Sequence, residues 1–242
     1  SEFVNLFNNR LNLLHFPHFN SLAVRPSPVI SEAPTERVAD VLHSIMNVDN
    51  LPAALNAIKL VWASMWSGKA YSFRQKNFIP HELMETAIIV QKMAKIDYSG
   101  EAYSRDSKEP GCVKILAGWG IPDGIIERQV GFDTVLLKQG PMDGERYTFT
   151  IKEELITPKE YALSYKGQDK AVVPVPRERI YAPILNSLEQ QEIGHYARKL
   201  DEALGKPQIV IWGRERNIII VGAKPLESPQ SASIVWIAPP FQ

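Results

Sequence analysis

The sequence predicts an α+β fold in which a mainly antiparallel sheet is flanked by helices. Two observations lead to this class. Apolar residues recur at helical spacing, or follow a cap residue, in four segments: 3–15, 35–46, 50–71 and 186–204. The other segments are short runs rich in β-branched and aromatic residues, separated by Gly, Pro and Asp clusters, which is typical of antiparallel strands.

The first quarter of the chain mixes both kinds of element. Residues 3–15 carry a broad helical stripe, and Thr35 is a suitable cap for a helix over 35–46. Between them, residues 21–25 predict a short strand that Pro26 and Pro28 end, since proline cannot donate to a ladder. The strongest helical pattern, 50–71, has a proline in its first turn, where proline is tolerated.

The remaining chain reads mostly as strands. They are predicted at 86–92, 100–104, 112–117, 134–138, 146–151 and 161–165. After the helix over 186–204, residues 208–212 and 218–221 form a predicted hairpin around a polar turn. We expect an N-terminal helix within 1–20, a module over 21–225 with lobes at roughly 21–150 and 151–225, and a tail over 226–242.

Composition excludes several functional classes. Lys plus Arg equals Asp plus Glu, 27 against 27, so no overall field favours nucleic acid or an anionic membrane surface. The single cysteine, Cys112, rules out an internal disulfide framework and is interpreted as a buried, inert thiol. No apolar run approaches the roughly 20 residues that cross a bilayer, and the N-terminus lacks a secretory pattern. A cytoplasmic protein without nucleic-acid or membrane partners is therefore predicted.

Short motifs lie in a fixed order along residues 21–225. They are SLAVRPSP (21–28), VWASMWSGKAYSFR (61–74), TAIIVQKM (86–93), SGEAYS (99–104), AGWGIPDG (117–124), GFDTVLLK (131–138), and a helix followed by the hairpin (188–225). In this order they resemble the ATP-binding domain of phosphoenolpyruvate synthase and pyruvate phosphate dikinase, and the second is also close to its counterpart in glucan water dikinase.

The resemblance implies an ATP-grasp-like fold that clamps ATP between two lobes and passes its β-phosphate to a histidine of a separate domain. Arg25 matches the family's phosphate-contacting arginine, and Gln91 matches the glutamine of the strand that holds adenine. These two are the candidate nucleotide-binding residues. Lys159 stands where the family has a lysine of uncertain role.

The departures from the family pattern concern magnesium. Where the family motif G-x-P-x-DIEW places its acids, this chain has Ile209 and Ile211, and the second metal ligand position is Gly222. The arginine that follows becomes Lys224, and a phosphate-binding serine becomes Pro26. The family's leading Gly-rich lysine segment has no counterpart in the roughly twenty residues before SLAVRPSP. No catalytic and no metal-ligating residue is therefore assigned, and no cofactor is expected.

Three hypotheses remain open. The first is a degenerate, non-catalytic ATP-grasp module that serves as a binding or structural part of a larger protein or complex. The alternative is a dikinase-type phosphotransferase domain whose Mg·ATP site is completed by a partner segment, with ATP and Mg²⁺ as cofactors. The third is an interaction module whose apolar tail, residues 233–241, docks on a protein partner.

Overall fold

The computed structural model describes residues 2–13, 21–29 and 41–226. The chain forms two compact units, one of residues 1–95 with 165–171, the other of 96–164 with 172–242. This division differs from the lobes expected at 21–150 and 151–225, because strands from both of those ranges join one sheet. The α+β class predicted from the sequence is confirmed.

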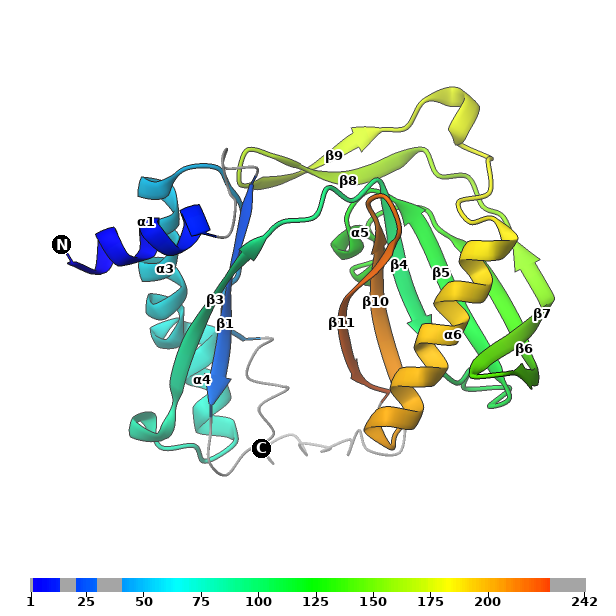
Figure 1. Ribbon diagram of the computed structural model, residues 1–242, viewed down its shortest axis with the longest axis horizontal. Coiled ribbons are helices and arrows are strands. Elements are labelled where there is room, and N and C mark those ends of the chain that lie inside the picture. The colour runs from blue at the N-terminus through cyan, green and yellow to red at the C-terminus, as the bar shows by residue number, and fades with distance from the viewer. Residues whose placement is uncertain (1, 14–20, 30–40, 227–242) are drawn as a thin grey trace, which may run out of the picture. The chain divides into compact units, whose positions relative to one another are not determined.

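The first unit is a small antiparallel sheet with helices (Figure 1). Its strands pair in the order β2-β1-β3. Its elements are α1 (Glu2–Leu13), β1 (Leu22–Val29), β2 (Ile45–Val48), α3 (Leu51–Ala63), a 3₁₀ turn (Ser64–Trp66), α4 (Gly68–Lys76), a second 3₁₀ turn (His81–Leu83) and β3 (Glu85–Lys92). The core of this unit lies between one face of the sheet and α3, where Leu22, Val24 and Val61 are fully buried.

One predicted boundary and one predicted element of this unit are wrong. The strand expected to stop before Pro26 runs on to Val29. Its neighbour β2 pairs with it only near Leu22 and Val24, so the N–H groups that Pro26 and Pro28 lack are not needed for hydrogen bonds to β2. The helix expected over 35–46 ends in a strand, β2, because Ile45 pairs with Val24. Residues 30–40 lie outside the described part.

The helix expected over 50–71 is also divided. Asn50 begins α3, and its side chain accepts a hydrogen bond from the Ala53 amide. The helix stops at Ala63, and Ser67 caps α4 by accepting from the Ala70 amide at 3.3 Å. The local capping signal of Ser67 therefore overrides an apolar pattern that continues across the break.

The second unit is built on a six-stranded antiparallel sheet in the order β11-β10-β4-β5-β6-β7 (Figure 1). The remaining elements are β4 (Tyr98–Tyr103), β5 (Cys112–Trp119), α5 (Pro122–Ile126), β6 (Asp133–Asp143), β7 (Arg146–Leu155), the pair β8 (Tyr161–Lys166) and β9 (Asp169–Pro174), a 3₁₀ turn (Arg177–Arg179), α6 (Ser187–Leu204), β10 (Gln208–Arg214) and β11 (Ile218–Pro225). The tip of the β8–β9 pair, residues 165–171, belongs to the first unit. Every strand expected within residues 96–226 is present, and β9 is an addition.

Helix α6 covers one face of this sheet (Figure 1). It begins with a capping box, in which the Asn186 side chain accepts from the Glu189 amide and the Glu189 carboxylate accepts from the Asn186 amide. It ends at Gly205, whose φ of 66° is the left-handed conformation that glycine adopts most readily. Ile193 of α6 and Trp212 of β10 are fully buried in the core beneath it.

None of the described helices combines the length and the apolarity that a bilayer crossing requires. The tail from residue 227 onward, with its predicted docking segment, lies outside the described residues.

Candidate functional site

The two predicted nucleotide-binding residues lie on one face of the small sheet. β1 and β3 pair with Arg25 opposite Ile89 and Ala23 opposite Gln91, and paired residues project to the same side. Leu22 and Val24 project to the other side, towards α3. Arg25 is half-buried and Gln91 is exposed, and within the described ranges neither side chain forms a hydrogen bond or ion pair. The structure therefore brings the two side chains onto a common face, without testing whether they bind a nucleotide.

The hairpin that the family pattern associates with magnesium forms the edge of the large sheet. We call β10 and β11 the ribbon. In β10, Val210 and Trp212 are fully buried under α6, so the alternating residues Ile209 and Ile211 project to the opposite face. Lys224 pairs with Ile209 and Gly222 pairs with Ile211, so all four share that face.

A buried carboxylate lies directly beside the ribbon on β4. Glu101 pairs with Ile211 and Tyr103 pairs with Ile209, so these residues project to the same face, which we call the Glu101 face. The Glu101 side chain is 4% exposed, and one of its oxygens accepts from the Tyr103 hydroxyl at 3.0 Å and from Arg128 Nη2 at 3.0 Å. Burial raises the pKa of the Tyr103 hydroxyl and Glu101 raises it further, so the hydroxyl stays protonated.

Arg128 reaches this carboxylate from the turn after α5. Its φ of 58° lies in the left-handed region that glycine favours, which costs an arginine of order 1 kcal/mol or more. Its Nη1 donates to the Ile125 carbonyl at 2.5 Å, its Nη2 also donates to the Tyr103 hydroxyl at 3.1 Å, and the guanidinium lies 5.1 Å from the centre of the Phe132 ring. The strained backbone is thus held by a set of contacts that directs the cation to Glu101.

These residues do not fit a divalent cation. Mg²⁺ requires hard oxygen ligands, and the ribbon offers only the side chains of Ile209 and Ile211 where the family pattern has acids. The carboxylate that the register places beside Ile211, Glu101, is already paired with a guanidinium. In the part of the chain that the structure describes, no three His, Cys, Asp or Glu side chains gather as a metal site would need.

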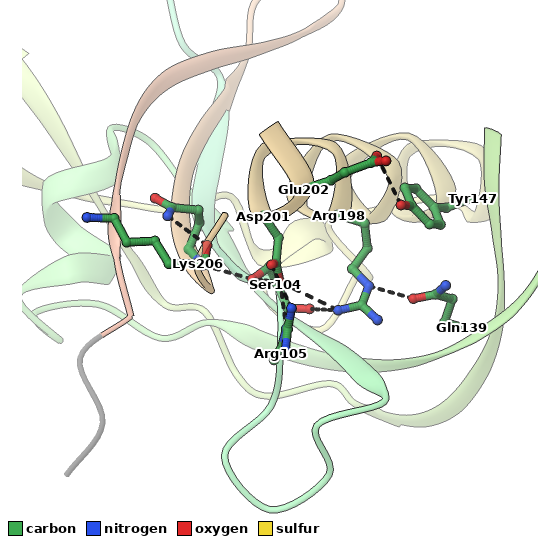
Figure 2. Close-up of polar contacts among 9 residues, drawn as sticks. Ser104, Arg105, Gln139, Tyr147, Arg198, Asp201, Glu202 and Lys206 are labelled. Atoms are coloured by element: carbon green, nitrogen blue, oxygen red, sulfur yellow. Dashed lines mark hydrogen bonds and ion pairs between the residues drawn. The ribbon is translucent and has the colours of Figure 1, made fainter. Parts of the chain in front are cut away.

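A polar network fixes where the ribbon begins (Figure 2). Asp201 near the end of α6 accepts hydrogen bonds from Arg105 Nε at 2.8 Å, from Arg105 Nη2 at 2.9 Å and from the Ser104 hydroxyl at 2.9 Å. The same hydroxyl accepts from the Gln208 amide at 2.8 Å, which ties the first residue of β10 to the end of β4. Burial acts to raise the pKa of Asp201, but the hydrogen bonds from Arg105 and Ser104 outweigh it and the pKa is lowered.

Arg198 extends this network along α6. Its Nη1 donates to the Ser104 carbonyl at 3.1 Å and its Nε to the Gln139 side-chain oxygen at 2.5 Å. One turn further, the Tyr147 hydroxyl donates to Glu202 at 3.2 Å (Figure 2). The ribbon is therefore held at its start by side chains of α6, β4 and β6.

Lys159, at the family's lysine position, is fully buried. Its Nζ donates to Asp133 at 2.5 Å and to the Thr157 carbonyl at 2.8 Å. The Asp133 carboxylate also accepts from the amides of Thr157 and Ile184, at 3.1 and 3.0 Å. Lys159 therefore joins three chain segments within the second unit.

Sequence reasoning missed Glu101 and Arg128. Glu101 is an acid inside an otherwise apolar strand, and that was the available signal. Its partner Arg128 lies 27 residues away, in a turn whose left-handed backbone the residue type does not reveal.

Comparison with known proteins agrees with the motif order. The family model described as pyruvate phosphate dikinase, AMP/ATP-binding domain, matches residues 5–235. A probable phosphoenolpyruvate synthase of Pyrococcus horikoshii is 24% identical over 217 residues, covering 85% of this chain and 26% of that protein. Phosphoenolpyruvate synthase of Escherichia coli is 25% identical over 217 residues, covering 85% of this chain and 27% of that protein.

A rifampicin phosphotransferase of Streptomyces sviceus is 25% identical over 217 residues, covering 87% of this chain and 24% of that protein. The chain thus spans about a quarter of the length of the curated relatives it matches. Since the family model covers nearly all of its residues, the chain belongs to the pyruvate phosphate dikinase AMP/ATP-binding domain family.

Proposed function

We propose that this chain is a degenerate ATP-grasp module that has lost Mg·ATP chemistry. It serves as a non-catalytic binding or structural part of a larger protein or complex and carries no cofactor. The observation that supports the proposal is the pair Ile209 and Ile211, which occupy the Glu101 face of the ribbon where the family pattern has acids.

The energetic argument concerns charge in phosphoryl transfer. Catalysis of this reaction depends on positioning and on neutralising the transferring phosphoryl group, largely through metal ions. Removing one preorganised donor typically costs about 3–4 kcal/mol of transition-state stabilisation. Losing the side chains that hold the metal removes more than one such interaction, which leaves little phosphoryl transfer.

A nucleotide contact remains part of the proposal for the small sheet. Arg25 and Gln91 share the face of the small sheet opposite to the one that packs on α3, and neither side chain forms a hydrogen bond within the described ranges. A cation and an amide in this arrangement suit a phosphate and a base edge, respectively. Further domains or a protein partner are proposed because the chain spans about a quarter of its relatives' length. A cytoplasmic location stays a prediction from the sequence.

The test is calorimetric titration of the 242-residue chain with ATP, once with excess Mg²⁺ and once with excess EDTA. We expect no magnesium-dependent binding and no turnover of ATP. Arg25→Ala and Gln91→Ala are titrated in parallel, so that any metal-independent nucleotide binding is assigned to these residues. Micromolar binding that appears only with magnesium would refute the proposal.

A second candidate function is favoured by the fact that the chain spans only part of the length of its relatives. If the rest of a longer protein or a partner supplies the missing acids, the module would be a dikinase-type phosphotransferase domain. Its discriminator is the isolated complex: consumption of ATP by the assembly, lost on Arg25→Ala, would establish this function. An assembly that consumes no ATP leaves the non-catalytic module as the better account.

A further inference from the structure

Three aromatic side chains of the first unit lie together at its surface. We call Trp66, Tyr71 and His81 the aromatic cluster, because the His81 ring is stacked 5.4 Å from Tyr71 and lies 6.2 Å from the Trp66 ring. Trp66 is 68% exposed and Tyr71 is 50% exposed. Large rings left in water gain none of the free energy that burial provides, so a cluster of them marks a surface suited to another molecule.

A buried cation lies beside this cluster. Arg74 is 1% exposed, and its guanidinium lies 5.3 Å from the centre of the Trp66 ring. Its Nε donates to His81 Nδ1 at 2.8 Å, and its Nη1 donates to the Met65 carbonyl at 2.5 Å and to Met84 Sδ at 3.0 Å. Its Nη2 is buried without an acceptor in the described part of the chain, and burial lowers the pKa of the guanidinium. None of these contacts is a carboxylate, so the described residues leave this charge uncompensated.

The two helices that carry the cluster are basic. Residues 51–80 contain no aspartate or glutamate and four cations, Lys59, Lys69, Arg74 and Lys76. The acids nearest along the chain are Asp49, just before α3, and Glu82 and Glu85, after α4. The helices themselves are therefore positive, and along the chain acids enter only at their two borders.

Phe78 adds a strained aromatic residue at the end of α4. It is 94% exposed, and its φ of 54° lies in the left-handed region that glycine and asparagine tolerate best. A bulky residue in this conformation costs free energy, and no burial offsets that cost here. Phe78 stands three residues before His81, so their Cα atoms are at most about 11 Å apart. The ring is therefore displayed close to the aromatic cluster at the expense of stability.

We propose that the aromatic cluster and Phe78 form a docking surface for a protein partner, through an acidic segment that also carries apolar side chains. The apolar side chains of that segment cover the exposed rings. Its carboxylates lie near Lys59 and above Arg74, whose charge is weakly screened in the protein interior. Tryptophan, tyrosine and arginine are the residues that most often dominate the binding energy of a protein interface.

Charge favours a protein over a nucleic acid as the occupant. The whole chain has no net charge, and four cations spread over thirty residues are few for a phosphate backbone. The inference goes beyond the proposed function. It would hold for a catalytic module as well, since none of these residues belongs to the ribbon or is one of the predicted nucleotide-binding residues.

The test measures binding of a fluorescein-labelled peptide to the 242-residue chain by fluorescence anisotropy. In the probe, glutamates alternate with leucine and phenylalanine, and a second probe has lysine in place of every glutamate. We expect saturable binding of the acidic probe that weakens as salt is raised, and no saturable binding of the basic probe. Trp66→Ala should weaken binding about tenfold or more, and Lys59→Gln about threefold. Lys138→Gln removes an exposed lysine of the second unit as the matched control and should change the affinity less than about twofold.

Phe78→Asn separates a docking role from a structural one. Asparagine tolerates the left-handed backbone, so this variant should unfold at the same or a higher urea concentration while binding the probe about threefold more weakly. Tyr181→Asn, which removes a 70% exposed ring of the second unit, is its control and should change the affinity less than about twofold. A lower urea midpoint with unchanged binding for Phe78→Asn would assign the ring a structural role and overturn the proposal.

The remaining outcomes identify a different occupant or none. If the acidic probe does not bind, or if Tyr181→Asn weakens binding as much as Trp66→Ala, the docking surface does not exist. The proposal is also overturned if a single-stranded thymidine oligonucleotide binds more tightly than the probe and depends on Trp66, or if sedimentation velocity shows self-association that Trp66→Ala abolishes. Tyr71→Ala takes the place of Trp66→Ala should the latter fold poorly by circular dichroism. None of these results changes the titration with ATP and Mg²⁺, so the proposed function is decided separately.

Discussion

Replacing Lys159 by methionine should destabilise the second unit severely, because the lysine touches no solvent and its charge is paired inside the protein. The substitution keeps much of the side-chain volume and removes the charge that faces Asp133, of which only 2% is exposed. The carboxylate would keep its bonds from the Thr157 and Ile184 amides and lose its counter-charge. Breaking a buried ion pair in this way costs about 3–5 kcal/mol. For a chain of this size the loss corresponds to a fall of about 6–20 °C in melting temperature.

The assay is urea unfolding of the complete chain, followed by circular dichroism at pH 7. Lys152→Met is the matched control, since Lys152 pairs with Glu109 where both side chains are more than 40% exposed, and such surface pairs contribute little. The double variant Lys159→Met with Asp133→Asn should recover part of the loss, because no buried charge is then left alone. A loss below about 1 kcal/mol for Lys159→Met would contradict the structural role of Lys159 and reopen a ligand-binding one.

Three further outcomes follow from individual side chains. Burial, and after it nearby cations, lower the pKa of His195, whose Nδ1 accepts a hydrogen bond from the Tyr147 amide. The stability of the fold should therefore be full above about pH 6.5 and fall below it. His195→Gln should flatten that decline in urea midpoints measured at pH 7.5 and 5.5. The lowered pKa of Asp201 gives stability that is present above its ordinary pKa near 4 and lost as pH falls further; Asp201→Asn should therefore be less stable than wild type at pH 7 and converge with it near pH 3. Ile209→Asp combined with Ile211→Glu places two carboxylates on the Glu101 face. Calorimetry with MgCl₂ should find saturable binding to this variant that is absent in the wild type. Equal heats for both proteins would count against the placement of residues 209 and 211 on one open face.

Elements with complete local signals were predictable from the sequence. The helix over 186–204 carries its own beginning and end, a capping box at Asn186 and a left-handed Gly205, and the structure places α6 within one residue of the prediction. The short strands after residue 86 were found for a similar reason, since turn residues bound each of them.

Elements that depend on distant partners were not predictable from the sequence. β2 is a strand because Val48 and Ile45 pair with β1, more than twenty residues earlier, and no local signal announces that pairing. Trp62 and Trp66 stand in an apolar helical pattern, yet 43% and 68% of their surface is exposed. The helix ends at Ala63 and a new helix begins after Ser67, so a single helical stripe over 50–71 does not tell which of these side chains are buried.

The candidate site was predictable where residue type alone mattered. The absence of acids at 209 and 211 can be read from the sequence, and register adds that Glu101 faces Ile211 across one strand spacing. The contact of Glu101 with Arg128 depends on how the turn after α5 bends back over β4, which is a property of the whole unit.

The two faces of the ribbon have separate physical requirements. Val210 and Trp212 are fully buried under α6, where a change of volume or polarity would cost several kcal/mol. Ile209 and Ile211 alternate with them and lie outside that core, so their identity can change while the sheet and α6 remain packed. Loss of acids at these positions is therefore compatible with an intact fold, and it gives no sign that the module as a whole is decaying. The pairing of Glu101 with Arg128 strengthens this point, because a buried carboxylate tied to a strained arginine is costly unless both partners are kept together.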